Sequence, residues 1–344
     1  MKRLIVHFGV HKTGSTFLQA AIHKNRDRLS ELGVLVPKAG LHFGLMAHHH
    51  LAWEILDDPQ FDPSRGGWGD LETEVASSNH ESVLISSEAF DRLPRLVRRV
   101  KDLSRRTVSW ATEPIFVGYV RPQVDFFNSN YTQMVKTFNY KHSFAKYIDR
   151  VLRNPRGCDY GVMQSNIYKA NCKAIFRPFN KEVLKRGLHV DFLETIGLPR
   201  QAMEDIPGIK NARPGPGTIA IIRAVHTVLD ACGRDRGFQA SQAEKTALRR
   251  RVIGVIGALD CDREPFWGGT PDLDVIVEKT FSSSNEQLAR NQWGKSWREV
   301  FPKEQGGKAA NEIDVHDIPR DEKLAAAFCN AILDISDYLK ARGK

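Results

Sequence analysis

A short segment near the amino terminus combines glycine, lysine and hydroxyl residues in a spacing suited to anion binding. Residues 9–16 read Gly-Val-His-Lys-Thr-Gly-Ser-Thr, follow an apolar, strand-like start at residues 4–6 and open a helical pattern. In such a strand–turn–helix unit, backbone N–H groups of the turn and first helical turn point at the anion, and the helix dipole favours its charge. Lys12 adds a cation, and hydroxyl donors come from Thr13, Ser15 and Thr16. The segment therefore predicts a site for a phosphate-like group.

A second candidate anion site lies about a hundred residues later. Arg121 closes the apolar run 115–120 and is followed by Pro122, which suits the first turn of a helix. Ser129 comes two helical turns after Pro122, so it shares nearly the same helix face. An arginine fork binds phosphate oxygens in a bidentate manner, so Arg121 and Ser129 together can meet one phosphate. The alternative is a surface arginine and a helical serine that share no ligand.

Both signatures resemble those of the sulfotransferases that use 3′-phosphoadenosine 5′-phosphosulfate (PAPS). The lysine precedes the inner glycine, unlike the nucleoside-triphosphate loop, in which Lys follows Gly. The resemblance covers about residues 1–230, and it is strong only at the two phosphate motifs. It implies that the 5′-phosphosulfate is held by the first loop, namely His11, Lys12, Thr13, Gly14, Ser15 and Thr16. It also implies that Arg121 and Ser129 hold the 3′-phosphate, and that a late loop carrying Arg213 covers the nucleotide.

Sulfuryl transfer to a hydroxyl also needs a base for the acceptor proton and positive charge near the departing phosphate. Lys12 can supply the charge, and Glu88, which follows the apolar strand 83–85, is the preferred base. Related enzymes use a glutamate near this place, and others use a histidine. The rival base is His49 or a neighbour in the cluster His42, His48, His49 and His50. Glu88 can instead be a structural carboxylate. A metal site is not expected, because consecutive histidines on a helix point in different directions.

These residues must be positioned by the elements around them. Strand patterns alternate with helical ones over the first two hundred residues, which predicts an α/β fold with a parallel sheet flanked by helices. Ligands of such sheets bind at the carboxyl ends of the strands, and this rule puts Lys12, Glu88 and Arg121 along one edge. We expect a single domain over residues 1–344, with a helical carboxyl-terminal part from about 216. Helices are expected at 15–32, 45–58, 69–79, 92–105, 143–153, 188–196, 218–231, 241–257 and 322–341, with a helix cap at 283–286.

Composition sets wider limits on the protein. The 344 residues are 41% hydrophobic and 26% charged, as in ordinary globular proteins, and no apolar run is long enough to span a membrane. Five cysteines without a Cys-x-x-Cys pair, and the lack of a secretory signal pattern, favour a cytoplasmic protein. The net charge is +9, with a dense basic group at 92–106 that is typical of a solvated helix face. No nucleic-acid-binding module is recognisable, so no nucleic-acid partner is expected.

The sequence therefore favours a PAPS-dependent sulfotransferase. It would transfer a sulfuryl group to a hydroxyl or amine of a small-molecule or glycan acceptor, without a metal, and leave adenosine 3′,5′-bisphosphate. One alternative is a P-loop kinase that uses ATP and Mg²⁺, with Glu88 near the metal. Another is a polyanion-binding protein without catalysis, which the net charge suggests. Neither the acceptor nor the oligomeric state can be read from the sequence.

Overall fold

The computed structural model describes residues 1–9, 13–42, 44, 46–204, 213–236, 242–257, 262–303 and 308–341. The chain divides into two compact units. Unit 1 comprises residues 1–123, 155–210 and 280–303, and unit 2 comprises 124–154, 211–279 and 304–344. The helices predicted beyond residue 216 lie mainly in unit 2. That all 344 residues form one domain stays a prediction.

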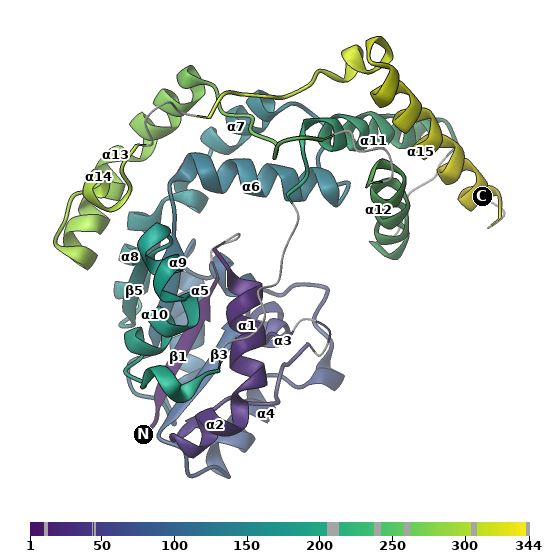
Figure 1. The fold of residues 1–344 in the computed structure, drawn as a ribbon. Coiled ribbons are helices and arrows are strands. Elements are labelled where there is room, and N and C mark those ends of the chain that lie inside the picture. The colour runs from purple at the N-terminus through teal and green to yellow at the C-terminus, as the bar shows by residue number, and fades with distance from the viewer. Residues whose placement is uncertain are drawn as a thin grey trace. The chain divides into compact units, whose positions relative to one another are not determined.

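Unit 1 contains a five-stranded parallel sheet flanked by helices, which confirms the predicted fold class (Figure 1). The strand order is β2–β3–β1–β4–β5. The strands are β1 (Arg3–Phe8), β2 (Val34–Leu35), β3 (Ser82–Ser87), β4 (Ile115–Val120) and β5 (Lys173–Pro178). Their apolar, β-branched residues are buried along nearly the whole of β1, β3 and β4, as expected for strands covered on both faces.

The strand order places a topological switch point at β1. The chain leaves β1 through α1 (Ser15–Lys24) toward β2, whereas it leaves β3 through α5 (Val97–Thr107) in the opposite direction, toward β4. Right-handed crossovers therefore put α1 and α5 on opposite faces of the sheet. Connections that diverge in this way leave a crevice at the carboxyl ends of β1 and β3, where ligands of open α/β sheets bind. The predicted anion loop follows β1 at this position.

Alternating side chains of the strands build two separate cores. Ile5, Leu84 and Val117 pack with α1 and α10 (Leu188–Thr195) in one apolar cluster. On the other face, the ring of Phe8 contacts those of Phe116 and Phe176 edge to face. Neighbouring residues of a strand point to opposite faces, so one short strand serves both cores. Packing of the two cores therefore fixes the orientation of each strand, and with it the position of the residue that follows the strand.

Some predicted helices are divided or shortened. The predicted helix 15–32 is two helices, α1 and α2 (Arg26–Glu31), because the side-chain Nδ2 of Asn25 donates to the carbonyl of Ala21 (2.8 Å) and ends the first. Of the predicted helix 45–58, the described residues are helical only in α3 (His49–Ile55), which ends before Asp57 because that residue has a φ of 51°. The remaining helices of unit 1 are α4 (Trp68–Ala76), α8 (Tyr160–Tyr168), α9 (Lys181–Arg186) and α14 (Trp297–Val300).

The basic group also differs from the predicted helix 92–105. A 3₁₀ helix covers Glu88–Arg92, and α5 begins only at Val97 because Leu96 is extended. Most arginines of the basic group 92–106 pair with nearby carboxylates. The ion pairs are Arg92–Asp58, Arg95–Asp91, Arg99–Asp57 and Arg106–Glu54. Local pairing therefore offsets much of this positive charge.

Unit 2 is helical. Its helices are α6 (Gln123–Lys136), α7 (Phe144–Leu152), α11 (Pro216–Arg236), α12 (Gln242–Gly257) and α15 (Glu322–Lys340). Tyr131 is central to its core, because its ring contacts Phe144, Tyr147 and Phe266, and its hydroxyl donates to Glu312 (3.1 Å).

The helix cap predicted at 283–286 is wrong. These residues lie inside α13 (Pro271–Trp293), where Asn285 exchanges two hydrogen bonds with Gln123 (2.8 and 2.9 Å). The helix starts at the pair Thr270–Pro271, a start signal that the sequence carried. Across the described parts of the chain, no helix is both long and apolar enough to cross a membrane.

Candidate functional site

Three segments meet at the carboxyl ends of β1 and β3. Phe8 pairs with Ser87 in the parallel register, and the next residues are Gly9 and Glu88. A Cβ atom at Gly9 would lie 2.0 Å from Ser15 Oγ, 2.6 Å from Ser15 Cβ and 3.5 Å from Glu88 Cβ. Only glycine allows this approach, so Gly9 brings the first turn of α1 against the start of the Glu88 segment.

The amino terminus of α1 lies at the end of the predicted anion loop. Gly14, the N-cap residue, takes a left-handed conformation (φ 80°) and has no side chain of its own to cap the helix. Ser15 is only 4% exposed, and its Oγ has no hydrogen-bond partner among the described residues. Thr13 is buried, whereas Thr16 is exposed. The N–H groups of the first helical turn, the helix dipole and the buried Ser15 hydroxyl all favour an oxyanion at this place. His11 and Lys12, the other predicted loop ligands, lie outside the described residues.

Gly14 is also held from the opposite side. A Cβ atom there would lie 2.4 Å from Leu188 Cδ2 and 3.4 Å from Phe179 Cε2. Leu188 begins α10, and Phe179 follows β5. The turn therefore has no room for a side chain, and its positive φ strains any residue other than glycine.

Glu88 is half-buried at the first position of the 3₁₀ helix that follows β3. Ser87, which caps that helix, accepts a hydrogen bond at its Oγ from the Ala89 N–H (3.1 Å). The same Oγ lies 2.6 Å from His49 Nδ1, so His49 contacts the residue that precedes Glu88, the other predicted base. The structure therefore brings both candidates to the end of β3.

The consecutive histidines turn to different partners, as the sequence predicts. His48 Nδ1 accepts from the Ser86 N–H (3.1 Å), so its Nε2 carries the proton and donates to the Pro37 carbonyl (3.0 Å). Burial lowers the pKa of His48 to about 4, and it does the same for His7, which lies 2.7 Å from Ser86 Oγ. Both imidazoles are therefore neutral structural groups that hold the end of β3. The described residues contain no cluster of His, Cys, Asp and Glu suited to a metal ion.

Arg121 follows the last residue of β4, on the sheet edge that also carries Gly9 and Glu88. Its carbonyl accepts a hydrogen bond from the hydroxyl of Tyr160 (2.9 Å), and the Tyr160 ring stacks on Trp297. Its predicted partner, Ser129, lies in α6 and belongs to unit 2. That Arg121 and Ser129 share one phosphate stays a prediction. Arg213 is exposed in unit 2, ahead of α11, and its nucleotide contact is likewise a prediction.

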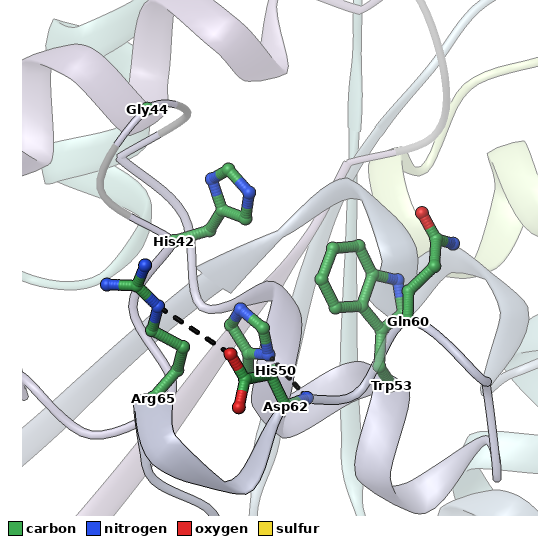
Figure 2. A pocket seen from close by; sticks show the side chains of 7 residues that line it. All are labelled: His42, Gly44, His50, Trp53, Gln60, Asp62 and Arg65. Carbon is green, nitrogen blue, oxygen red and sulfur yellow. Dashed lines mark hydrogen bonds and ion pairs between the residues drawn. The ribbon is translucent and has the colours of Figure 1, made fainter. Parts of the chain in front are cut away.

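A pocket lies beside the His49 segment, within unit 1. It has a volume of about 400 Å³, and its lining residues are His42, Gly44, His50, Trp53, Gln60, Asp62 and Arg65. Figure 2 shows Trp53 and Gln60 on one side of it, His42 and Arg65 on the other, and His50 with Asp62 between them. The sequence pointed to His42 and His50, but Asp62 and Arg65 were missed. Their only signal was their position in the turn-rich segment after α3.

An ion pair with a buried carboxylate supports the same edge of the sheet. Arg177 of β5 donates from Nη2 (2.5 Å) and Nε (3.0 Å) to Asp191 of α10, and Tyr119 of β4 donates its hydroxyl to Asp191 (2.8 Å). Burial and the neighbouring carboxylate raise the pKa of Tyr119, so its hydroxyl keeps its proton. The trio ties two strand ends to the helix that confines Gly14.

In comparisons with known proteins, the chain matches no protein-family model, no curated protein and no solved structure.

Proposed function

We propose that this protein is a sulfotransferase that uses PAPS and transfers a sulfuryl group to a hydroxyl or amine of an acceptor. The observation that carries the proposal is the anion cradle after β1. There Gly9 packs on Ser15, α1 begins at Gly14, which has no side chain to cap it, and Ser15 Oγ is buried without a partner among the described residues. A phosphate or sulfate oxygen would satisfy these donors.

A second anion-binding group favours a donor with phosphates at two positions. Arg121 follows β4, which neighbours β1 in the sheet, and its guanidinium suits a phosphate. A ligand with one phosphate chain needs only the cradle, whereas PAPS carries a 3′-phosphate in addition to its 5′-phosphosulfate. The order of lysine and glycine in the loop supports the same choice over an ATP-binding loop.

In the proposed reaction, PAPS supplies the sulfuryl group. The bond between sulfur and the 5′-phosphate oxygen breaks, a bond between sulfur and the acceptor oxygen forms, and the acceptor proton passes to Glu88. The cradle amides and Lys12 stabilise the negative charge that grows on the 5′-phosphate. Glu88 suits the role of base because it stands beside Gly9 and Ser15. His49, joined to the same strand end through Ser87, is the alternative base.

Calorimetry with two nucleotides tests the proposal. Adenosine 3′,5′-bisphosphate should bind without metal, and more tightly than ATP with Mg²⁺. A preference for ATP with Mg²⁺ would instead support the kinase alternative, which needs a metal ion near Glu88. Failure of both nucleotides to bind would contradict both readings. We also propose that the protein works in the cytoplasm, because its five cysteines show no paired spacing.

A further inference from the structure

The pocket beside His49 lies outside the anion loop after β1. Three aromatic side chains form its walls: the ring of Trp53 meets that of His50 edge to face (4.9 Å between centroids), and His42 stacks on His50 (5.8 Å, 7° between planes). Its volume of about 400 Å³ lies within the range of ligand pockets, ~300–1,000 Å³. The three rings pack against one another and together give the pocket an aromatic wall.

Polar groups of both kinds surround this space. Asp62 offers carboxylate oxygens, Arg65 offers guanidinium donors, and Gln60 offers both a donor and an acceptor. The Asp62 carboxylate accepts from the N–H (3.0 Å) and hydroxyl (2.7 Å) of Ser64, and these bonds lower its pKa. The side chain therefore stays ionised and presents acceptors to the pocket at neutral pH.

The charges of the pocket balance. Arg65 Nε and Asp62 Oδ2 are 3.9 Å apart, and the two side chains carry opposite charges. Burial and the neighbouring His42 lower the pKa of His50, so that imidazole is neutral at pH 7. An anionic ligand would face Asp62, and a cationic one would face Arg65. The preferred ligand is an uncharged molecule with several groups that both donate and accept hydrogen bonds.

We propose that this pocket binds an uncharged sugar ring. Hydroxyls on several sides of a saccharide match Gln60, Asp62 and Arg65, while its apolar ring face covers an aromatic wall. A phenol has one hydroxyl and would leave most of these polar groups unmatched, which costs binding free energy.

The position of the pocket relates it to the proposed reaction. His49 stacks on Trp53 (5.2 Å between centroids, 21° between planes), and its Nδ1 contacts Ser87, the residue before Glu88. This inference rests on the proposed function in one respect, namely that the sugar belongs to the acceptor. A saccharide in the pocket would then be held beside His49, which contacts the residue before Glu88.

Saturation-transfer NMR with maltose, cellobiose and lactose, and with p-nitrophenol as the competing class, tests the site. At least one of the disaccharides should bind, with a dissociation constant in the millimolar range. Asp62→Asn keeps an oxygen for Ser64 but removes the charge, and it should weaken this binding about tenfold or more. Trp53→Ala should weaken the binding by a similar factor. If Trp53→Ala fails to fold, the binding of Asp62→Asn alone decides the test.

Asp57→Asn is the matched control. Asp57 is outside the pocket and pairs with Arg99 (2.8 Å), and asparagine tolerates its positive φ. This variant should bind the disaccharide as the unmodified protein does. The proposal is overturned if none of the three disaccharides binds, if p-nitrophenol alone binds, or if Asp62→Asn and Asp57→Asn behave alike.

Binding of adenosine 3′,5′-bisphosphate, measured in the same samples, separates this inference from the proposed function. If the nucleotide binds and the disaccharides do not, the sugar site is wrong and sulfotransfer stands. If a disaccharide binds in the pocket and the nucleotide does not, the sugar site stands and sulfotransfer is wrong.

Discussion

Ser15→Ala should change the stability of the ligand-free protein and its affinity for nucleotide in opposite directions. The Ser15 hydroxyl is buried and has no partner among the described residues. An unpaired hydroxyl in a protein interior costs about 1–3 kcal/mol. Its removal leaves a void of only one oxygen atom. The free energy of unfolding without ligand should therefore rise by about 1 kcal/mol.

The same substitution removes a donor that the proposed ligand would use. A hydrogen bond to a charged group contributes about 1.5–3 kcal/mol, so adenosine 3′,5′-bisphosphate should bind about ten- to a hundredfold more weakly. A ligand present at about 100 times its dissociation constant stabilises the folded state by about 2.7 kcal/mol, and a tenfold weaker ligand at the same concentration by about 1.4 kcal/mol. The ligand-induced stabilisation should therefore fall by half or more.

Urea unfolding with and without adenosine 3′,5′-bisphosphate measures both effects. Ser87→Ala is the matched control for stability, because the Ser87 hydroxyl is equally buried but bonded to Ala89 N–H and His49. That control should lose about 1–3 kcal/mol. If Ser15→Ala is destabilised as well, its hydroxyl has a partner in the ligand-free protein. If the nucleotide stabilises Ser15→Ala as much as the unmodified protein, Ser15 is not in the nucleotide site.

Three further predictions concern the proposed phosphate site, the base and the pH dependence. Arg121→Ala should weaken adenosine 3′,5′-bisphosphate about ten- to a hundredfold but leave adenosine 5′-phosphate nearly unchanged in calorimetry; equal losses would remove Arg121 from the 3′-phosphate. Glu88→Gln should lower the turnover of PAPS about 10²- to 10⁴-fold while nucleotide binding persists, and a fully active variant would move the role of base to His49. His7 and His48 have folded-state pKa values of about 4, below the ordinary 6.5, so the unfolded chain binds more protons than the folded one between these values. The free energy of unfolding should therefore fall as the pH drops from 6.5 toward 4, by up to about 1.4 kcal/mol per pH unit for each histidine; a flat profile from urea unfolding at several pH values would show that these imidazoles accept protons in the folded state.

The elements that position the candidate site could be predicted because their patterns are local. The apolar runs at β1, β3 and β4 and the residues that end them need no knowledge of the rest of the chain. The missed elements depend on distant partners. The segment 283–286 carries cap residues, yet it continues α13 because Asn285 pairs with Gln123, far away in the sequence. A local cap pattern does not predict a helix boundary when its polar side chain is buried and forms its hydrogen bonds only in the folded core.

In the candidate site too, some features follow from the local sequence and others only from tertiary contacts. The order of glycine, lysine and hydroxyls in residues 9–16, and an arginine after an apolar run, already specify two anion-binding groups, because backbone donors and side-chain charge follow from residue type and spacing. Tertiary packing alone decides that Gly9 meets Ser15 and Glu88, and that Ser87 joins His49 to the same strand end. It also decides that Asp62 and Arg65 balance each other in a pocket with Trp53. These contacts join segments that are far apart in the chain, and sequence separation does not predict their distance in space. That distance is set by the pairing of β1 with β3 and by the packing of α3 against β3.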